Sequence, residues 1–149
     1  YIDKMKKINI DVILSSNSLY FGKKILSIPK ICSINRHTAL LPSYGGLWPI
    51  FHAYKNNEKY TGVSVHLMTE KIDDGKVISQ QKVEINSDDT IADLYKKCFK
   101  ISSILVLDAL EKISLRDFSE FKNNEKKSYF SFPSKDDWRK FRKKGGIFI

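Results

Sequence analysis

Apolar positions along the first third of the chain follow two different spacings, and each spacing predicts an element. Residues 11–15 form a short apolar run with β-branched members, which predicts a buried parallel strand, and residues 32–35 predict the next strand. Residues 19–27 predict a short helix between them. Residues 47–54 predict a second helix, with Pro49 in the first turn, where a missing backbone N–H costs nothing.

Residues 61–69 alternate strictly, which predicts a strand with Val63 and Val65 on one face and Ser64 and His66 on the other. Residues 76–85 predict a second strand, and one of its faces is expected to carry Val77, Ser79, Gln81 and Val83. The turn Asp73-Asp74-Gly75 between them predicts a β-hairpin with Asp73 at the loop tip, from which it could reach the segment after residue 35.

Helical spacing dominates the last third of the chain. Thr90 and Asp93 resemble a capping box, and a long helix is expected from there to about residue 113. Its expected buried stripe is Ile91, Leu94, Tyr95, Cys98, Ile101, Leu105 and Ala109. Residues 116–128 are polar and predict a loop, whereas residues 134–145 predict a capped helix with basic residues in its last turn.

Composition narrows the class of protein. A chain of 149 residues with 42% hydrophobic residues is long enough for one domain with a core. No apolar run has the length of a membrane span, and we expect no membrane association. Cys32 and Cys98 lie far apart and predict reduced thiols in a cytoplasmic protein, with no metal site. The net charge of +9 is spread along the chain, so nucleic acid is a possible partner but is not favoured.

Three polar residues carry the candidate chemistry. Asn35 and His37 follow a predicted strand of an α/β sheet, at the end where such sheets bind ligands, and Asp73 comes from the predicted hairpin. An amide donor, an imidazole and a carboxylate are the groups needed to move an acyl unit between two nitrogens. The carboxylate is expected to favour the protonated imidazole. Which group is the general base stays open, and each residue alone would more commonly be structural.

The run from Ile34 to Pro42, with Tyr44, Gly46 and Pro49 behind it, resembles the folate-dependent formyltransferases. That family includes methionyl-tRNA, glycinamide ribonucleotide and sugar N-formyltransferases. The segment Thr61-Gly62-Val63-Ser64-Val65-His66 and the turn Ile72-Asp73-Asp74-Gly75 follow in the family's order. Two positions depart from the pattern, because Ala39 replaces a serine and Gly45 replaces an arginine.

The resemblance implies an α/β, Rossmann-like formyltransferase fold with a β-hairpin and a long C-terminal helix. The first β-α-β unit of the family is lacking, so residues 1–149 are expected to be a single catalytic domain, truncated at the N-terminus relative to the family. The implied function is transfer of a formyl group from 10-formyltetrahydrofolate to a primary amine, without a metal. The resemblance assigns Asn35, His37 and Asp73 as catalytic residues.

The resemblance also implies binding residues. The folate pocket is expected to contain Ser18, Leu19, Tyr20, Thr69, Glu70 and Ile72. The substrate loop is expected to contain Leu41, Pro42, Tyr44 and Gly46. His66 lies on a strand and is interpreted as structural, or as a support for a catalytic residue, rather than as catalytic itself, and His52 is interpreted as a packing residue.

Several functions stay open. The favoured acceptor is a small, phosphate-bearing amine, namely that of an amino-sugar nucleotide, and the alternatives are methionyl-tRNA and glycinamide ribonucleotide. A truncated domain that binds folate or a partner without turnover is a second hypothesis. An RNA-binding module is a third, based on the basic cluster at Arg139, Lys140, Arg142, Lys143 and Lys144. The oligomeric state is left open.

Overall fold

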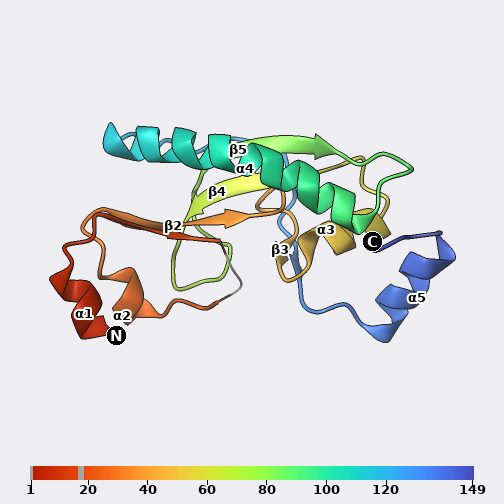
Figure 1. Cartoon of the computed structure of the whole chain (residues 1–149), viewed down its shortest axis with the longest axis horizontal. Helices are drawn as coiled ribbons and strands as arrows, with labels where there is room; N and C mark the ends of the chain where they lie inside the picture. Colours follow the sequence, from red (N-terminus) through yellow and green to blue (C-terminus); the bar gives the residue numbers. More distant parts are fainter. Residues whose placement is uncertain (1, 17–18) are drawn as a thin grey trace.

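A four-stranded mixed sheet organises the chain in the computed structural model, which describes residues 2–16 and 19–149. Its spatial order is β1 (Val12–Ser15), β2 (Cys32–His37), β4 (Tyr60–Leu67) and β5 (Val77–Glu84). β1 and β2 are parallel, whereas β4 runs antiparallel to both β2 and β5 (Figure 1). The predicted α/β class, the two N-terminal strands and the antiparallel pair are therefore confirmed.

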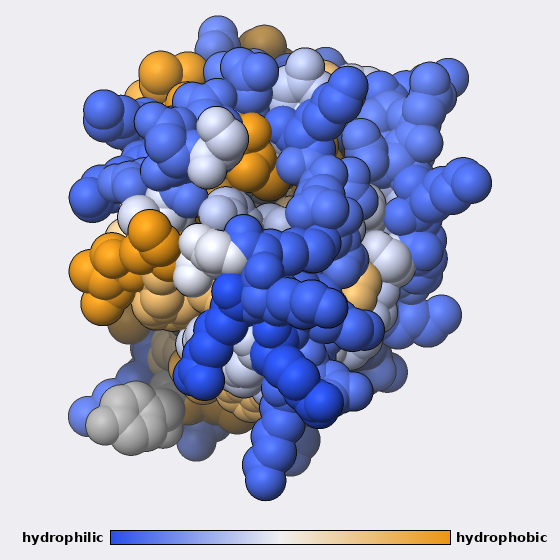
Figure 2. Space-filling model, turned by 90° about the vertical axis from the view of Figure 1, so that its right-hand side faces the viewer, coloured by the Kyte–Doolittle hydropathy of each residue, from blue (hydrophilic) through white to orange (hydrophobic). Residues whose placement is uncertain are grey.

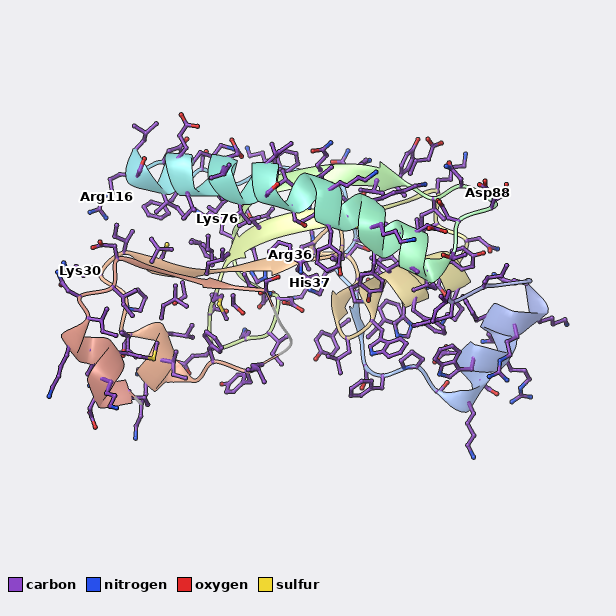
Figure 3. All side chains as sticks on the ribbon, viewed as in Figure 1. Lys30, Arg36, His37, Lys76, Asp88 and Arg116 are labelled. Carbon is purple, nitrogen blue, oxygen red and sulfur yellow. The ribbon has the colours of Figure 1, made fainter. Side chains whose placement is uncertain are left out.

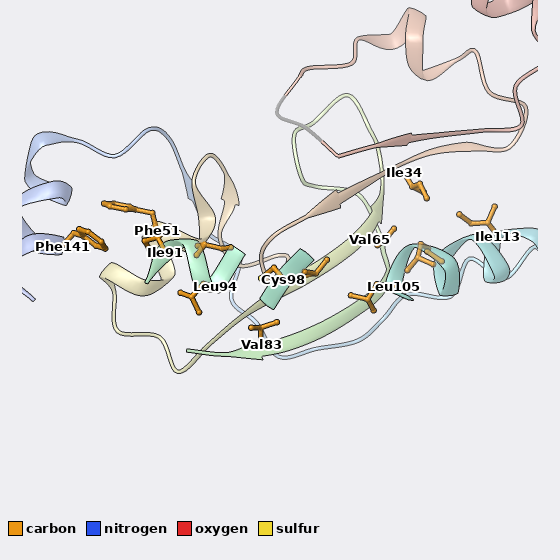
Figure 4. Packing of buried hydrophobic residues seen from close by; sticks show 14 residues of the cluster. Ile34, Phe51, Val65, Val83, Ile91, Leu94, Cys98, Leu105, Ile113 and Phe141 are labelled. Carbon is orange, nitrogen blue, oxygen red and sulfur yellow. The ribbon is translucent and has the colours of Figure 1, made fainter. Parts of the chain in front are cut away.

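Helix α4 (Ile91–Ser114) covers one face of the sheet. The predicted capping box is present, since Thr90 and Asp93 satisfy each other's backbone N–H groups. The buried stripe extends further along the helix than predicted and includes Ser102 and Ile113, while Tyr95 and Ile101 pack at its margin. Figure 4 shows the core between this helix and the strands; its members include Ile34, Val65, Leu94, Cys98 and Leu105.

A second, aromatic part of the core joins α3 (Pro49–Lys55) to α5 (Lys135–Lys143). The rings of Phe51 and Trp138 lie 4.7 Å apart, and those of Phe51 and Phe141 lie 5.0 Å apart. Lys55, which is largely buried, forms an ion pair with Asp137 at 2.5 Å. Both helices were predicted, and hydrophilic side chains cover most of the molecular face on this side (Figure 2).

The N-terminal part of the chain departs from prediction. The helix expected over residues 19–27 is only α2 (Lys23–Leu26), and its N-cap, Gly22, provides no side-chain cap. A further helix, α1 (Ile2–Lys7), was not predicted. The strand expected to be buried, β1, lies at the edge of the sheet, and Leu14 is 48% exposed. The prediction of a buried strand was wrong because, among the described residues, only β2 pairs with it.

The predicted faces of β5 also need one correction. Val65 pairs with Ser79 and His66 pairs with Val77, so a β-bulge leaves Ile78 as the extra residue. Ile78 therefore joins the core. Val77 pairs with His66, whereas Ser79 pairs with Val65, so the side chains of Val77 and Ser79 lie on opposite faces of the sheet. The connection between the two strands spans residues 68–76, which is longer than a tight hairpin turn.

A small parallel pair completes the fold. β3 (Gly45–Gly46) pairs with β6 (Tyr129–Phe130), which the sequence did not predict. Residues 116–128 contain no helix or strand, as predicted. Within the described part of the chain, no helix has both the length and the apolar character needed to cross a bilayer.

Candidate active site

The candidate catalytic residues of β2 lie on the face of the sheet opposite α4. Ile34 points into the core beneath α4, so the alternation of the strand turns Asn35 and His37 the other way. Figure 3 shows His37 near the middle of the molecule, at the end of β2. Both side chains are largely buried, which keeps their geometry fixed.

Asp73 reaches the same place from the loop between β4 and β5. One of its carboxylate oxygens, Oδ2, accepts a hydrogen bond from the backbone N–H of Gly46 at 2.8 Å and lies 3.8 Å from His37 Nδ1. The side chain is only 8% exposed, and the loop brings it to His37, as the turn predicted. The end of this loop packs closely against β4 at Gly75, where a Cβ would lie 1.7 Å from the carbonyl oxygen of Leu67.

The protonation of His37 follows from its contacts. Its Nε2–H donates to the carbonyl oxygen of Tyr44 at 3.0 Å, because a carbonyl can only accept, and this leaves Nδ1 facing Asp73. Burial lowers the pKa of His37, and the Asp73 carboxylate opposes this effect without overcoming it. The carboxylate therefore favours the protonated imidazole, as expected, but burial has the larger effect and the pKa of His37 lies below its ordinary value.

His66 belongs to the same cluster. Its Nδ1–H donates to the carbonyl oxygen of Leu67 at 2.9 Å, and its Nε2 lies 3.5 Å from Asp73 Oδ1. Burial on its own raises the pKa of Asp73, but the contacts with the His66 and His37 rings and the hydrogen bond from the Gly46 N–H outweigh it and hold the pKa below its ordinary value. His66 thus helps to keep Asp73 ionised.

Asn35 completes the cluster and retains free hydrogen-bonding capacity. Its Nδ2 lies 3.4 Å from His66 Nε2, and an amide nitrogen carries a second hydrogen. Its Oδ1 is buried and has no hydrogen-bond partner among the described residues. Buried polar atoms without a partner are uncommon, so this oxygen is a candidate contact for a ligand.

A pocket of about 420 Å³ opens beside these four side chains. Asn35, His37, His66 and Asp73 all line it. Of the residues predicted for folate and substrate, the following also line it: Leu19, Tyr20, Thr69, Ile72 and Gly46. The sequence did not indicate a binding role for Arg36, Trp48, Tyr95, Tyr129 or Phe132, which line it as well. Tyr129 and Phe132 are brought there by the unpredicted β3–β6 pairing.

Other predicted binding residues lie elsewhere. Glu70, Leu41, Pro42 and Tyr44 do not line the pocket, and Ser18 lies outside the described residues. Leu41 instead has a structural role: its carbonyl oxygen accepts hydrogen bonds from Gln80 at 2.9 Å and from Asn123 at 2.8 Å. Tyr44 contributes its backbone to His37, as described above. A direct substrate contact by these residues stays a prediction.

The backbone around the pocket is strained at three places. Tyr44, Trp48 and Asp73 have φ values of 57°, 55° and 50°, in the left-handed region that residues other than glycine rarely adopt. Such conformations persist where the surrounding structure holds them, and they concentrate at functional sites. In residues 2–16 and 19–149 there is no group of three or more His, Cys, Asp or Glu side chains placed to hold a metal ion.

Comparison with known proteins identifies the class. The model of the formyl transferase family matches residues 1–110, and the chain belongs to this family. A methionyl-tRNA formyltransferase of Mycoplasmopsis pulmonis is 38% identical over 126 residues, which is 84% of this chain and 44% of that protein. The chain thus spans less than half the length of this curated relative.

Solved structures agree on the fold. An N-formyltransferase from Helicobacter canadensis, in complex with folinic acid and dTDP-3-aminofucose, is 31% identical with a TM-score of 0.61, over 76% of this chain and 47% of that one. Phosphoribosylglycinamide formyltransferase from Bacillus halodurans is 29% identical with a TM-score of 0.70, over 81% of this chain and 63% of that one. The Rossmann-like formyltransferase fold is therefore confirmed.

Proposed function

We propose that residues 1–149 act as a single catalytic domain that transfers a formyl group from 10-formyltetrahydrofolate to a primary amine. One observation carries the proposal: Asn35, His37 and Asp73, which are distant in sequence, converge around one pocket with His66 behind them. A folate-binding remnant without turnover would not need these three polar side chains buried together, since burying them has a free-energy cost.

The pocket fits a folate donor in character. Leu19, Tyr20 and Ile72 are large apolar or aromatic residues that stay exposed beside it, and the unpaired Oδ1 of Asn35 offers a polar contact within it. Apolar walls with a few convergent polar atoms are typical of small-molecule sites. The donor would supply the formyl carbon, and no metal is required for this chemistry.

The roles of the residues follow from their geometry. The free N–H of Asn35 is available to stabilise negative charge that develops on the formyl oxygen. The acceptor amine loses a proton as its nitrogen bonds to the formyl carbon, and the bond from that carbon to N10 of the donor breaks while N10 takes up a proton and tetrahydrofolate leaves. His37 Nδ1 and Asp73 Oδ2, which are 3.8 Å apart, form the place that receives the proton from the amine, and the carboxylate stabilises the imidazolium that results. His66 and the Gly46 N–H hold Asp73 in position.

We propose the amine of an amino-sugar nucleotide as the acceptor. The Helicobacter canadensis enzyme, which is similar to this chain, was crystallised with dTDP-3-aminofucose. A small acceptor also suits a pocket of about 420 Å³. A cytoplasmic location is part of the proposal, because Cys32 and Cys98 are both free thiols.

Methionyl-tRNA is the second candidate acceptor. The relative from Mycoplasmopsis pulmonis, 38% identical over 126 residues, is a methionyl-tRNA formyltransferase. The basic last turn of α5, which contains Lys140, Arg142 and Lys143, could contact phosphates.

A product assay tests both candidates together with the reaction itself. The protein is incubated with 10-formyltetrahydrofolate and, separately, with a dTDP-amino sugar, methionyl-tRNA or glycinamide ribonucleotide. Release of tetrahydrofolate and the mass of the acceptor are followed. We expect formylated amino-sugar nucleotide; formylated methionyl-tRNA would select the second candidate. No product with any amine, from protein that binds 5-formyltetrahydrofolate, would contradict the catalytic proposal.

A further inference from the structure

Tyr44 contacts the catalytic cluster through its backbone, while its side chain lies outside the active-site pocket. Its carbonyl oxygen accepts the hydrogen bond from His37 Nε2–H at 3.0 Å. Its side chain instead lines a separate cavity of about 240 Å³, together with Glu58 and Tyr60. Among the described residues, the two cavities have no lining residue in common. Tyr44 thus joins the catalytic imidazole to a part of the molecule that the pocket does not include.

Three contacts fix the Tyr44 side chain. Its hydroxyl donates to Glu58 Oε1 at 2.7 Å and accepts from Asn56 Nδ2 at 3.1 Å. Its ring stacks on that of Phe130, with centroids 5.0 Å apart and an angle of 11° between the planes. Burial and the hydrogen bond to Glu58 raise the pKa of Tyr44 to about 12. The hydroxyl therefore stays protonated at neutral pH and remains a donor to Glu58.

The backbone of Tyr44 has a conformation that needs such support. Its φ of 57° lies in the left-handed region, and residues with a side chain stay there only where the surrounding structure holds them. The peptide that follows directs its carbonyl to His37 and its N–H, that of Gly45, to the Ser128 carbonyl at 3.0 Å. Relaxation of Tyr44 to a more common conformation would turn this peptide and move the carbonyl away from His37.

The Tyr44 carbonyl also decides which nitrogen of His37 carries the proton. With Nε2–H donated to this carbonyl, the unprotonated Nδ1 faces Asp73 at 3.8 Å, where the proposed reaction needs a proton acceptor. The Asp73 carboxylate favours the opposite tautomer, because it can accept a hydrogen bond from an Nδ1–H. The other titratable or charged groups that act on the ring, His66 and Arg36, oppose a positive charge on it. The carbonyl is thus the group that keeps the proton on Nε2.

We propose that Tyr44 is a positioning residue of the active site: its hydroxyl, anchored by Glu58, holds the Tyr44 carbonyl against His37 and keeps the imidazole in the tautomer that can accept a proton. This inference rests on the proposed function and adds to it a residue that acts through His37. The role differs from the substrate contact that the sequence predicted for Tyr44, because the side chain points into the separate cavity.

Two single variants and their combination test the proposal. Tyr44→Phe removes the hydroxyl and keeps the ring that stacks on Phe130, and Glu58→Leu removes the acceptor at an exposed position. Tyr60→Phe is the matched control, because Tyr60 lines the same cavity but not the active-site pocket. Formyl transfer gives kcat and KM for each protein. Nitrogen-15 NMR of the imidazole rings reports the tautomer of His37, since the chain has only 3 histidines.

We expect kcat to fall about tenfold in Tyr44→Phe, with the KM for 10-formyltetrahydrofolate unchanged within about twofold. The double variant should lose little more than Tyr44→Phe alone, because the two side chains act through one hydrogen bond. His37 should show only the Nε2–H form in the unaltered protein and in Tyr60→Phe, and a mixture of tautomers in the Tyr44 and Glu58 variants.

A kcat for Tyr44→Phe within about twofold of that of the unaltered protein would overturn the inference. A loss of kcat with an unchanged His37 spectrum would overturn it as well, because Tyr44 would then act by another route. Glu58→Leu carries the same test if Tyr44→Phe does not fold. The spectrum needs no turnover, so it decides the inference even in a protein without formyl transfer. A negative result in an active protein leaves the proposed reaction standing.

Discussion

The pocket has two walls of opposite character. Its buried polar wall consists of Asn35, His37, His66 and Asp73, whose side chains are largely buried and are held by hydrogen bonds or ionic contacts. Its exposed rim consists of Leu19, Tyr20, Ile72, Tyr129 and Phe132, all of which are more than half exposed. Fixed polar groups stabilise a developing charge, whereas exposed rings and alkyl chains gain by being covered. Substitutions in the polar wall should therefore change rates, and those in the rim should change affinities.

The largest effect is expected from Asp73→Asn. Asparagine keeps the shape and can still accept from the Gly46 N–H, but it cannot stabilise a proton on His37. We expect the rate of formyl transfer to fall by about 10³-fold, with folate affinity nearly unchanged. Asp74→Asn is the matched control, since Asp74 pairs with Lys127 at the surface. Similar losses of rate in both variants would remove the distinction between the two residues.

The next effect concerns the backbone that supports the polar wall. Gly46 has a φ of 94°, and a Cβ there would lie 2.1 Å from the carbonyl oxygen of Phe130. Gly46→Ala should lower the free energy of unfolding by about 2–4 kcal/mol. Gly145→Ala is the control, because Gly145 has a φ of 74° but no atom within 4 Å, and it should cost only about 1 kcal/mol. Urea denaturation measures both, and equal costs would show that the contact with Phe130 does not matter.

The pH dependence gives a smaller and graded effect. Burial lowers the pKa of His37 below its ordinary value of about 6.5, so the residue is neutral at neutral pH and able to accept a proton. The value of kcat/KM should be constant near pH 7 and should fall about tenfold per pH unit below the lowered pKa. An acid limb that begins above pH 7 would mean that the imidazole is protonated at neutral pH, against the geometry described here.

The smallest effect is expected at the exposed rim. Ile72 is 52% exposed and lines the pocket, so Ile72→Ala removes apolar surface without disturbing the buried polar wall. The affinity for 5-formyltetrahydrofolate should weaken by about three- to tenfold, and kcat should stay the same. A loss of kcat with unchanged folate affinity would contradict the division between the two walls.

Local signals were sufficient to predict much of this arrangement. The motif around Asn35 and His37 and the turn at Asp73 identified three members of the polar wall, and their spacing along strands placed them at the sheet end. The sequence did not indicate what the His66 ring contacts, because a histidine on a strand gives no sign of its neighbours. Its contact with Asp73 depends on the fold of the loop between β4 and β5, with a bulge next to it.

Pairing between strands that are distant in sequence explains the features that the sequence did not predict. Tyr129 reaches the pocket because β6 pairs with Gly45 and Gly46, which are more than 80 residues earlier. Two-residue strands have no periodicity for a sequence to reveal. The exposure of β1 could likewise not be predicted, because an apolar run shows that a strand is suited to burial but not which elements pack against it.

Replacing His37 by alanine tests the central claim most directly, when formyl transfer and binding of 5-formyltetrahydrofolate are measured on the same preparation. Asp73 and the Tyr44 carbonyl both contact the His37 ring. We predict that transfer is abolished and that folate binding stays close to that of the unaltered protein. Transfer that persists within a few-fold of the original rate would contradict the assignment of this cluster as the site of the reaction.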